Sequence, residues 1–587
     1  MYSTLKNVQS TIAMLKERGI RNCVISPGNS HNAIVRSMEN DNFFVTYNIV
    51  DERSAAFFAI GLIQELNEPV AVCCTAGTAV SNLLSGVTEA YRRNLPLVVI
   101  TADKNPYYLN QYEDQMIEQK NIFKDVIKYS VTLPIVRDQK DEWYCNRLLN
   151  EAFLEMNHHG TGPIHINVPI EEGMFAIGKY FTAKELPKIN VIKRIDGYST
   201  SEKWKEKFDS LRGKKVMIIY GQDYHVPSET VELVESIFNK YNCIFAVDKL
   251  SNLKGRGTLE ISRAALYNKF RNNNDLKPDI VISLAGNTVL DYKYRLKDIK
   301  LSFEHWIVNE EGRVADPFKK LTTVFECTTL EFLRKMDQFG SEVHDHSYYE
   351  AWREENEKFV IPKFEFSNLY AVQKLMEKIP ENSLLNLANS TTIRIAQYFD
   401  LSDSVKVYCN RGVNGIDGCM STFIGQSAVT DKLSFLIIGD LAFFYDMNAL
   451  WNRYVGKNVR IMLNNNAGSS LFHFNQGLKN FPTLNQNVAA EHFTTAKGWV
   501  EDLGFKYLSA NNKVEFDEAL KEFVSPNSDR PIIFEVFTKK EEDARLQHEF
   551  YNLNRAPLEG KEAFKASLKK TIKSVIGEEI INKIRTR

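Results

Sequence analysis

Two polar segments that follow apolar runs carry residue types suited to binding a divalent cation. An apolar run at 435–438 ends at Gly439-Asp440, and a second run at 459–463 ends at an asparagine triplet, 464–466. Short apolar runs rich in β-branched residues are typical of buried strands in α/β proteins. When a helix joins two parallel strands, their carboxyl ends lie side by side, where open α/β sheets bind ligands. The spacing therefore predicts that Asp440 and the triplet meet at one edge of a sheet.

The oxygen atoms at these two strand ends match the preferences of Mg²⁺. Asp440 offers a carboxylate, Asn465 a side-chain carbonyl, and Ala467, just beyond the triplet, a backbone carbonyl. Magnesium prefers oxygen ligands and keeps some positions for water and for phosphate oxygens. The segment therefore predicts a site for a metal-bridged diphosphate, with Gly439 and Leu441 flanking the carboxylate. The structural alternative is a Gly-Asp turn beside an asparagine-rich loop in an ordinary α/β domain.

Length and composition indicate a multidomain globular protein. The 587 residues exceed a single core and predict about three or four domains. A formal net charge of −1 does not indicate binding to nucleic acid or to an anionic membrane, which attract strongly basic proteins. No apolar stretch reaches the ~18 residues that a membrane-spanning helix needs. The N-terminus lacks the apolar core of a signal peptide, and the eight cysteines include no Cys-x-x-Cys pair. We expect a cytoplasmic protein with buried cysteines and with neither nucleic acid nor membrane as a partner.

Strand and helix patterns alternate along most of the chain, which predicts an α/β fold of three doubly wound parallel-sheet domains. The expected boundaries are 1–181, 182–345 and 346–540, followed by a charged helical C-terminal extension, 541–587. A Lys-rich stretch, 182–207, is interpreted as a linker, and the charged stretch 344–363 as a separator. A helical pattern at 559–583 is interpreted as a packing or oligomerisation helix, with a regulatory element as the alternative. The predicted strands are 22–25, 44–46, 70–74, 97–100, 162–169, 215–219, 280–283, 383–387, 405–408, 435–438, 459–463 and 531–537.

The order of these motifs resembles the thiamin-diphosphate-dependent enzyme superfamily, in which Gly-Asp is followed about 25 residues later by two asparagines. Through about residue 540 the chain is most similar to the 2-succinyl-5-enolpyruvyl-6-hydroxy-3-cyclohexene-1-carboxylate synthases of the menaquinone pathway. The resemblance implies thiamin diphosphate with Mg²⁺ or Mn²⁺, and pyrimidine-binding, central and diphosphate-binding domains in that order. The matching segments are VDERSAAFFAIGL, TAGTAVSNLLSGVTEAY, PLVVITAD, DQMIEQKNIF, CNRGVNGIDGCMST, GDLAFFYDMNAL and LNQNVAAEH.

Two residues fit the further needs of thiamin-diphosphate chemistry. Glu52 ends an apolar strand and precedes a helix of small residues, so its carboxyl group could share a proton with the aminopyrimidine ring. The alternative is a helix N-terminal carboxylate favoured by the dipole. Ile416 is a candidate for the apolar wedge that holds the two cofactor rings bent toward each other. The resemblance implies a homodimer or homotetramer with active sites between subunits, in which Glu52 of one chain serves the cofactor of another.

The resemblance also implies which residues of the active site bind the donor substrate. The family reaction decarboxylates 2-oxoglutarate and adds the resulting carbanion to isochorismate. Asn389, Ser390 and Arg394 match the segment that holds the distal carboxylate of 2-oxoglutarate, and Arg411 matches a second anion-binding arginine. An arginine suits a carboxylate because its fork gives bidentate, charge-assisted hydrogen bonds. Gln115 matches the family's glutamine near the reacting carbon. The alternative for either arginine is a surface or interdomain ion pair.

The acceptor side departs from the family pattern. Where the family has Ser-Pro-Gly-Ser-Arg-Ser, this chain has Ser30 at the position of the arginine. Where the family has Ala-Asp-Arg-Pro, this chain has Lys104 at the position of the arginine. After the triplet, Gly-Gly-x-Ile-Phe is replaced by a segment that contains Leu471, which changes the pocket wall. His31 enters where the family has a small residue. It is either a loop histidine bonded to solvent or backbone, or an acid–base group near the thiazolium ring, since imidazole titrates near neutral pH.

These residues predict a 2-oxoglutarate-decarboxylating carboligase that acts on a small-molecule 2-oxo acid and an acceptor. The acceptor is isochorismate or a different enone or carbonyl compound. Simple 2-oxo acid decarboxylation and acetolactate-type ligation of pyruvate are alternatives, although pyruvate has no distal carboxylate for Arg394. A cofactor-binding scaffold without activity is the non-enzymatic alternative.

Overall fold

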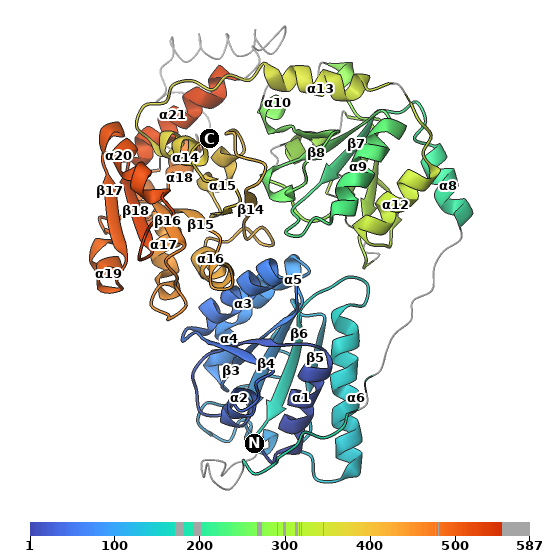
Figure 1. The fold of residues 1–587 in the computed structure, drawn as a ribbon, viewed down its shortest axis with the longest axis vertical. Helices are drawn as coiled ribbons and strands as arrows, with labels where there is room; N and C mark the ends of the chain where they lie inside the picture. The colour runs from blue at the N-terminus through green and yellow to red at the C-terminus, as the bar shows by residue number, and fades with distance from the viewer. Residues whose placement is uncertain are drawn as a thin grey trace, which may run out of the picture.

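The chain folds into three α/β units, each built on a six-stranded sheet in which every neighbouring pair of strands is parallel. Figure 1 shows the first unit (blue) below the other two, which lie side by side. The sheets of doubly wound type confirm the predicted fold class. The computed structural model describes residues 1–170, 181–189, 191, 201–266, 273–289, 292–297, 301–311, 315, 317–318, 320–343, 345–475, 477–478 and 481–554.

The first unit has the strand order β2-β1-β3-β4-β6-β5, and its central strands are covered on both faces. Its strands are β1 (Asn22–Ile25), β2 (Val45–Asn48), β3 (Val70–Cys74), β4 (Leu97–Asp103), β5 (Tyr129–Thr132) and β6 (Ile164–Pro169). Its helices are α1 (Lys6–Glu17), α2 (Asn32–Glu39), α3 (Glu52–Leu66), α4 (Thr78–Asn82), α5 (Leu84–Arg92), η1 (Pro106–Tyr108) and α6 (Gln139–Met156).

The middle unit has the order β12-β11-β10-β7-β8-β9, so the direction of strand addition reverses between β7 and β10. Its strands are β7 (Val216–Tyr220), β8 (Cys243–Val247), β9 (Thr258–Glu260), β10 (Ile280–Leu284), β11 (Glu304–Val308) and β12 (Leu321–Phe325). Its helices are α8 (Ser201–Asp209), α9 (Ser228–Lys240), η2 (Lys249–Ser251), α10 (Ser262–Leu266), η4 (Asn274–Leu276), α11 (Tyr292–Leu296), α12 (Thr329–Phe339) and α13 (Ser347–Glu357).

The third unit has the order β14-β13-β15-β16-β18-β17, the same as the first unit when strands are counted from the start of each. Its strands are β13 (Leu384–Leu387), β14 (Lys406–Tyr408), β15 (Ser434–Gly439), β16 (Val459–Asn465), β17 (Lys506–Ala510) and β18 (Ile532–Phe537). Its helices are α14 (Asn368–Met376), α15 (Thr391–Ala396), α16 (Cys419–Ser427), α17 (Asp440–Tyr445), η5 (Met447–Ala449), α18 (Ser470–Phe474), η6 (Leu484–Val488), α19 (Lys497–Asp502), α20 (Lys513–Phe523) and α21 (Lys540–Leu553).

The first and third units share one hydrophobic core through the packing of α3 on α16. A Cβ atom on Gly61 of α3 would lie 2.1 Å from the Thr422 carbonyl oxygen, and one on Gly425 of α16 would lie 2.2 Å from the Phe58 carbonyl oxygen. Because no side chain fits at either position, the two backbones are in direct contact. This contact sets the position of the N-terminal end of α3, where Glu52 lies, relative to the third unit.

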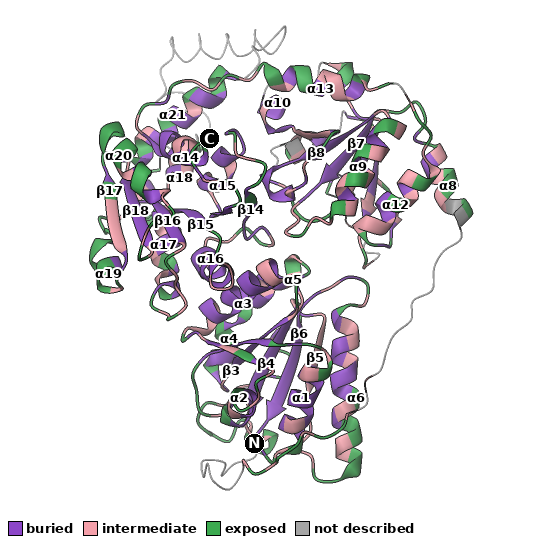
Figure 2. Cartoon of the chain, in the orientation of Figure 1, coloured by how far each residue is buried: buried purple, intermediate pink, exposed green. Residues whose placement is uncertain are grey.

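The stretches interpreted as linker and separator both contain helices. The helix α8 begins at Ser201, within the predicted linker, and α13 lies within the predicted separator. Tyr348 and Trp352 of α13 are one helical turn apart and are buried in the core of the middle unit, so the high charge of this stretch belongs to the opposite face. Figure 2 shows the resulting alternation of buried and exposed faces on the outer helices.

The C-terminal extension begins with α21, whose Phe550 is buried in the core of the third unit. The helical pattern predicted at 559–583 lies outside the described residues. All eight cysteines are buried and free, as the sequence predicts. Across the part of the chain that the structure describes, no helix has the length and apolar character needed to cross a bilayer.

Candidate active site

Asp440 and the asparagine triplet lie at the carboxyl edge of the third sheet. The strands β15 and β16 are parallel neighbours, and Gly439 pairs with Asn464 in their register. Asp440 follows directly as the first residue of α17, and both its side chain and that of Asn465 are buried. The apolar runs that end at these residues therefore bring the two segments together, because neighbouring parallel strands end at the same edge.

A tight turn after β16 closes over the Asp440 carboxylate. Asp440 Oδ2 accepts hydrogen bonds from the backbone N–H groups of Asn466 (3.1 Å) and Gly468 (2.9 Å). The turn needs left-handed backbone at Ala467 (φ 62°) and a positive φ at Gly468 (133°). A Cβ atom on Gly468 would lie 2.7 Å from the Ala489 carbonyl oxygen, so this position requires glycine. The turn thus holds the Ala467 backbone beside the carboxylate.

A buried glutamate fixes the orientation of the Asn465 amide. Asn465 Nδ2 donates to Glu535 Oε1 (2.7 Å) and to the Thr494 carbonyl oxygen (2.9 Å), which leaves Oδ1 facing the turn. Glu535 is fully buried and also accepts hydrogen bonds from Thr495 and Tyr507. The carboxylate of Asp440 and the amide oxygen of Asn465 are therefore both presented by groups that cannot rotate freely.

The chemistry of this donor set fits a hard divalent cation. Carboxylate, amide and backbone oxygens are the ligands that Mg²⁺ takes, and a site with so few protein ligands leaves room for phosphate oxygens. The side-chain oxygen Oδ1 of Asn464, the first residue of the triplet, is buried without a hydrogen-bond partner. Among the described residues no cluster of three or more histidine, cysteine or carboxylate side chains could hold a metal. A metal at this edge would therefore depend on the amide and backbone oxygens.

A cavity of about 310 Å³ lies beside this turn and gathers most of the residues predicted from the sequence. Asn465 and Ala467 belong to the turn that forms its wall but do not line it directly. The predicted residues that line the cavity are Asn389, Ser390, Arg394, Arg411, Ile416, Gly439, Asp440, Leu441 and Leu471. The lining residues that the sequence analysis did not single out include Asn368, Asn414 and Ser470.

Two arginines that line this cavity each have a buried nitrogen without a hydrogen-bond partner. Arg394 on α15 has its Nη1 atom buried without a hydrogen-bond partner. Arg411 is 7% exposed; its Nη1 donates to Asn389 Oδ1 (2.9 Å), and its Nε has no partner. A buried guanidinium N–H without an acceptor is costly unless an anion completes it. Both arginines line the same cavity as Asp440, and an anion bound there could pair with them.

Ser390, between Asn389 and α15, has an unusual backbone conformation (φ 75°, ψ −129°). This region is strained for a residue with a Cβ atom and persists only where its surroundings impose it. The preceding Asn389 is anchored by two hydrogen bonds of 2.6 Å from its amide to the carbonyl oxygens of Asn410 and Gly415. Asn389 thereby ties the start of α15 to the loop that carries Arg411 and Ile416.

The remaining predicted residues lie at the carboxyl edge of the first sheet. Glu52 is the first residue of α3, after β2, with Asn82 Nδ2 3.5 Å from its carboxylate. Gln115 is exposed and adopts a left-handed conformation (φ 53°), and its backbone lies directly over Gly77, the residue before α4. The structure therefore divides the predicted residues between two sheet edges, because all the described residues that line the cavity belong to the third unit.

The acceptor-side residues differ in their surroundings. The backbone N–H of Ser30 donates to Thr75 Oγ1 (3.2 Å), which ties the loop after β1 to the loop after β3. Lys104 Nζ forms an ion pair with Glu113 Oε1 (2.9 Å), so its charge is already neutralised. His31 is 1% exposed, and burial lowers the pKa of its imidazole to about 4. A buried, uncharged ring at neutral pH favours the interpretation of His31 as a packed loop residue over that of a proton donor.

Two residues near the Asp440 turn were not singled out in the sequence analysis. Asp543 of α21 is fully buried, accepts hydrogen bonds from Asn466 Nδ2 (2.9 Å) and Thr538 Oγ1 (2.7 Å), and supports the turn from behind. Burial raises the pKa of Asp543 to about 6. His492 places Nε2 3.2 Å from Asp440 Oδ2. Asp543 lies in a segment whose composition indicates only a charged helix, whereas His492 ends the segment LNQNVAAEH, whose resemblance to the family could have drawn attention to it.

Comparison with known proteins finds one matching family model and several relatives that share one name. Residues 6–122 match the family model described as thiamine pyrophosphate enzyme, N-terminal TPP binding domain. The 2-succinyl-5-enolpyruvyl-6-hydroxy-3-cyclohexene-1-carboxylate synthase of Phocaeicola vulgatus is 40% identical over 94% of this chain and 99% of that protein. The synthases of the same name from Bacteroides fragilis (39% identical, 94% and 99% covered) and Flavobacterium psychrophilum (32%, 94% and 100%) are also similar.

Among solved structures, a benzoylformate decarboxylase from Polynucleobacter necessarius has a similar fold. Its TM-score is 0.67 at 14% sequence identity, with 92% of this chain and 99% of that chain covered. At this identity the likeness concerns the fold alone. It extends over all three units, so their arrangement is shared by two chains of very different sequence.

Proposed function

The chain belongs to the family of 2-succinyl-5-enolpyruvyl-6-hydroxy-3-cyclohexene-1-carboxylate synthases, and from this premise we propose that its donor substrate is 2-oxoglutarate. It is a thiamin-diphosphate-dependent, decarboxylating carbon–carbon transferase. The observation that supports the donor assignment is that two arginines, each with a buried nitrogen that lacks a partner, line the same cavity as Asp440. Such a pair of arginines suits the distal carboxylate of 2-oxoglutarate, which pyruvate lacks.

The third unit would hold the cofactor and its metal. The Asp440 carboxylate, Asn465 Oδ1 and the Ala467 carbonyl oxygen would bind Mg²⁺ or Mn²⁺, with Gly439 and Leu441 beside the diphosphate. Asn389 and Ser390 line the cavity next to them, and Ile416 would serve as the apolar wedge. When bound, thiamin diphosphate supplies the nucleophilic carbon for the donor and stabilises the electron pair left by loss of CO₂.

Other residues of the chain would orient the donor and move protons. Arg394 and Arg411 would hold the distal carboxylate by charge-assisted hydrogen bonds and thereby fix the oxo carbon in place. Glu52 would exchange a proton with a cofactor ring nitrogen, and Gln115 would act near the reacting carbon. Leu471, which lines the cavity, would form part of the pocket wall on the acceptor side.

A homodimer or homotetramer with shared sites would bring the two sheet edges together. Glu52 does not line the cavity, although Glu52 and the residues that line the cavity belong to the same predicted site. Large apolar side chains are exposed around Glu52 and around the Asp440 turn, as expected for a surface that a second copy covers. They are Val50, Tyr445, Trp451 and Phe493, the last of which is 91% exposed. Free, buried cysteines agree with a cytoplasmic enzyme.

The acceptor is isochorismate or a different enone or carbonyl compound. The names of the relatives favour isochorismate. The alternative is favoured by the acceptor-side residues, since Ser30 carries no charge and Lys104 is paired with Glu113. Losing a bidentate arginine opposite a carboxylate costs on the order of 2 kcal/mol, so an acceptor with fewer carboxylates would lose less.

Arg394→Ala should raise the KM for 2-oxoglutarate by about 10- to 150-fold, because a hydrogen bond to a charged group contributes about 1.5 to 3 kcal/mol. Pyruvate turnover should change little, since pyruvate has no carboxylate to meet this arginine. Steady-state and single-turnover release of CO₂ from both oxo acids would measure the effect. Arg530→Ala, which removes an exposed arginine far from the cavity, is the matched control. Equal use of pyruvate and 2-oxoglutarate by the unmutated enzyme would refute the donor assignment.

Combining Ser30→Arg with Lys104→Arg should improve the use of isochorismate by on the order of tenfold or more, because each arginine can form a bidentate pair with a carboxylate. The KM for 2-oxoglutarate should stay the same, since both positions lie in the first unit and the donor arginines in the third. Product formation at varied isochorismate concentrations would measure this. Glu113→Gln in the same background tests whether the partner of Lys104 limits the gain. A changed donor KM would contradict the separation of the two sides.

A further inference from the structure

The loop that carries Arg411 is held by all three units. From the first unit, Glu89 of α5 is 1% exposed and accepts hydrogen bonds from the backbone N–H groups of Gly412 and Val413, at 3.1 Å each. From the third unit, Asn389 binds the Arg411 side chain and the backbone on both sides of it. The remaining support comes from the middle unit, for which no chemical role has been described above.

Two amide side chains of the middle unit bind the backbone at Arg411. Gln222 Nε2 donates to the Cys409 carbonyl oxygen (2.6 Å), and Asn287 Nδ2 donates to the Arg411 carbonyl oxygen (2.9 Å). These two carbonyl groups flank Asn410, so both ends of the backbone segment from which Arg411 projects are fixed. The contacts reach Arg411 itself, whereas Glu89 binds only the two residues after it.

Gln222 and Asn287 are positioned by the reversal in the middle sheet. Gln222 follows β7 and Asn287 follows β10, the adjacent strands at which the strand order reverses. The two loops bind each other, because the Gln222 N–H donates to the Asn287 carbonyl oxygen (2.9 Å) and the Gly286 N–H to the Gln222 carbonyl oxygen (3.1 Å). A Cβ atom on Gly221 would lie 1.8 Å from the Gly286 carbonyl oxygen, so the loops touch through glycine. Open α/β sheets use this crevice for ligands.

A buried carboxylate of the middle unit also interacts electrostatically with Arg411. Asp248, which follows β8, is buried and accepts hydrogen bonds from the backbone N–H groups of Leu250 (2.8 Å) and Val289 (2.7 Å). Burial raises the pKa of Asp248 to about 6, and the positive charge of Arg411 is among the influences that lower it. The Asp248 carboxylate thus lies within electrostatic reach of the guanidinium group.

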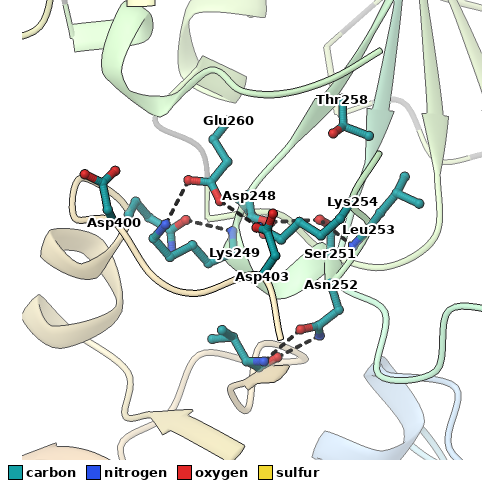
Figure 3. Close-up of polar contacts among 12 residues, drawn as sticks. Asp248, Lys249, Ser251, Asn252, Leu253, Lys254, Thr258, Glu260, Asp400 and Asp403 are labelled. Atoms are coloured by element: carbon teal, nitrogen blue, oxygen red, sulfur yellow. Dashed lines mark hydrogen bonds and ion pairs between the residues drawn. The ribbon is translucent and has the colours of Figure 1, made fainter. Parts of the chain in front are cut away.

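A second, outer part of the same interface fixes the middle unit to the third without touching Arg411. Asn252 exchanges two hydrogen bonds with the backbone of Val407 in β14 (2.9 and 2.7 Å). Lys254 pairs with Asp403 (3.3 Å), and Arg263 with Asp400 (2.5 Å). Figure 3 shows Asn252, Lys254 and Asp403 together with the Lys249–Glu260 pair behind them. These outer contacts between the two units are therefore distinct from the contacts that hold the Arg411 loop.

We propose that Gln222 and Asn287 are positioning residues for Arg411, through which the middle unit sets the affinity of the enzyme for the donor carboxylate. The proposal rests on the proposed function, since Arg411 is assigned there to 2-oxoglutarate. The amide pair holds the backbone so that the Arg411 guanidinium meets Asn389 and faces the cavity. Without it, Arg411 keeps its charge but loses its fixed direction, which a bidentate contact requires.

The test compares Gln222→Ala/Asn287→Ala with the matched control Lys254→Ala, which weakens the outer interface only. For each full-length protein loaded with thiamin diphosphate and Mg²⁺, the KM and kcat for 2-oxoglutarate and pyruvate are measured. Hydrogen–deuterium exchange of the backbone amides at 408–414 is followed by mass spectrometry. The double variant should exchange faster at 408–414 and raise the KM for 2-oxoglutarate about tenfold, with kcat and pyruvate turnover within about twofold. Lys254→Ala should change neither.

Unchanged exchange and an unchanged KM in the double variant would overturn the proposal. Equal effects in Lys254→Ala would also overturn it, because the cause would then be a loosened interface. A loss of kcat with both oxo acids would point to a general structural defect and count against it. If the unmutated enzyme does not prefer 2-oxoglutarate, the donor assignment fails, and the exchange at 408–414 still decides whether the amide pair holds the loop.

Discussion

Replacing Asp440 by alanine should abolish the binding of thiamin diphosphate with Mg²⁺. Among the described residues that line the cavity, Asp440 alone carries a carboxylate, so no other group in this set can neutralise the metal. The affinity should fall by more than about 100-fold, beyond the 10- to 100-fold typical of groups that only orient a metal ligand. Isothermal titration calorimetry with thiamin diphosphate and Mg²⁺ measures this directly and does not depend on substrate or turnover.

A second substitution separates charge from folding. The carboxylate of Asp440 accepts three backbone hydrogen bonds, from Leu441, Asn466 and Gly468, so alanine also removes the support of the turn. Asp440→Asn keeps a side-chain oxygen but loses the negative charge, and it should retain the fold while binding the metal weakly. Asp529→Ala, an exposed carboxylate in the same unit, serves as the control. Native affinity in a folded Asp440 variant would disprove the assignment.

Glu52→Gln should lower kcat by about 10²- to 10⁴-fold, the usual contribution of a positioned acid or base. Glutamine keeps the volume and the start of α3 but cannot exchange a proton. The affinity for thiamin diphosphate with Mg²⁺ should remain within a few fold, because the turn proposed to bind the metal belongs to the third unit. Turnover of 2-oxoglutarate and calorimetry on the same preparation would show the two effects separately, and an unchanged kcat would exclude the role.

The same variant reports whether sites are shared between chains. Chains with Asp440→Ala keep a native Glu52, and chains with Glu52→Gln keep a native Asp440. If each site combines the two residues from different chains of a dimer, co-expression of both variants should recover up to roughly one quarter of the native activity. If each chain builds its own site, the mixture should remain as inactive as its components.

The apolar pattern predicted the central strands better than the edge strands. The predicted bounds of β1 and β3 agree with the structure, because both strands are buried along their whole length and read as continuous apolar runs. Four of the strands absent from the predicted set, β5, β9, β12 and β17, lie at sheet edges and are only partly buried. Strands of this kind carry polar residues, so their pattern resembles that of loops. The other two, β8 and β11, are interior strands of the middle sheet, and β8 is buried along its whole length.

The candidate site was predictable where its residues follow strands in order along the chain. Gly439, Asp440 and the triplet meet because neighbouring parallel strands end together. The groups that orient them, Glu535 and Asp543, come from β18 and α21, and their partners are set by tertiary packing alone. For the same reason, nothing in the sequence near Lys104 reveals its pairing with Glu113, and the pattern around His31 does not reveal its burial.

The glycine contact between α3 and α16 bears on how this enzyme could diverge. Backbone touches backbone at Gly61 and Gly425, so mutation has no side chain there with which to alter the spacing of the two helices. The frame that relates Glu52 to the third unit is therefore inherited nearly unchanged. The loops that carry Ser30 and Lys104 are attached to the same sheet but do not pack within this contact. With the acceptor role proposed for these loops, acceptor preference can change by substitutions in either loop while the helix contact that positions Glu52 stays the same.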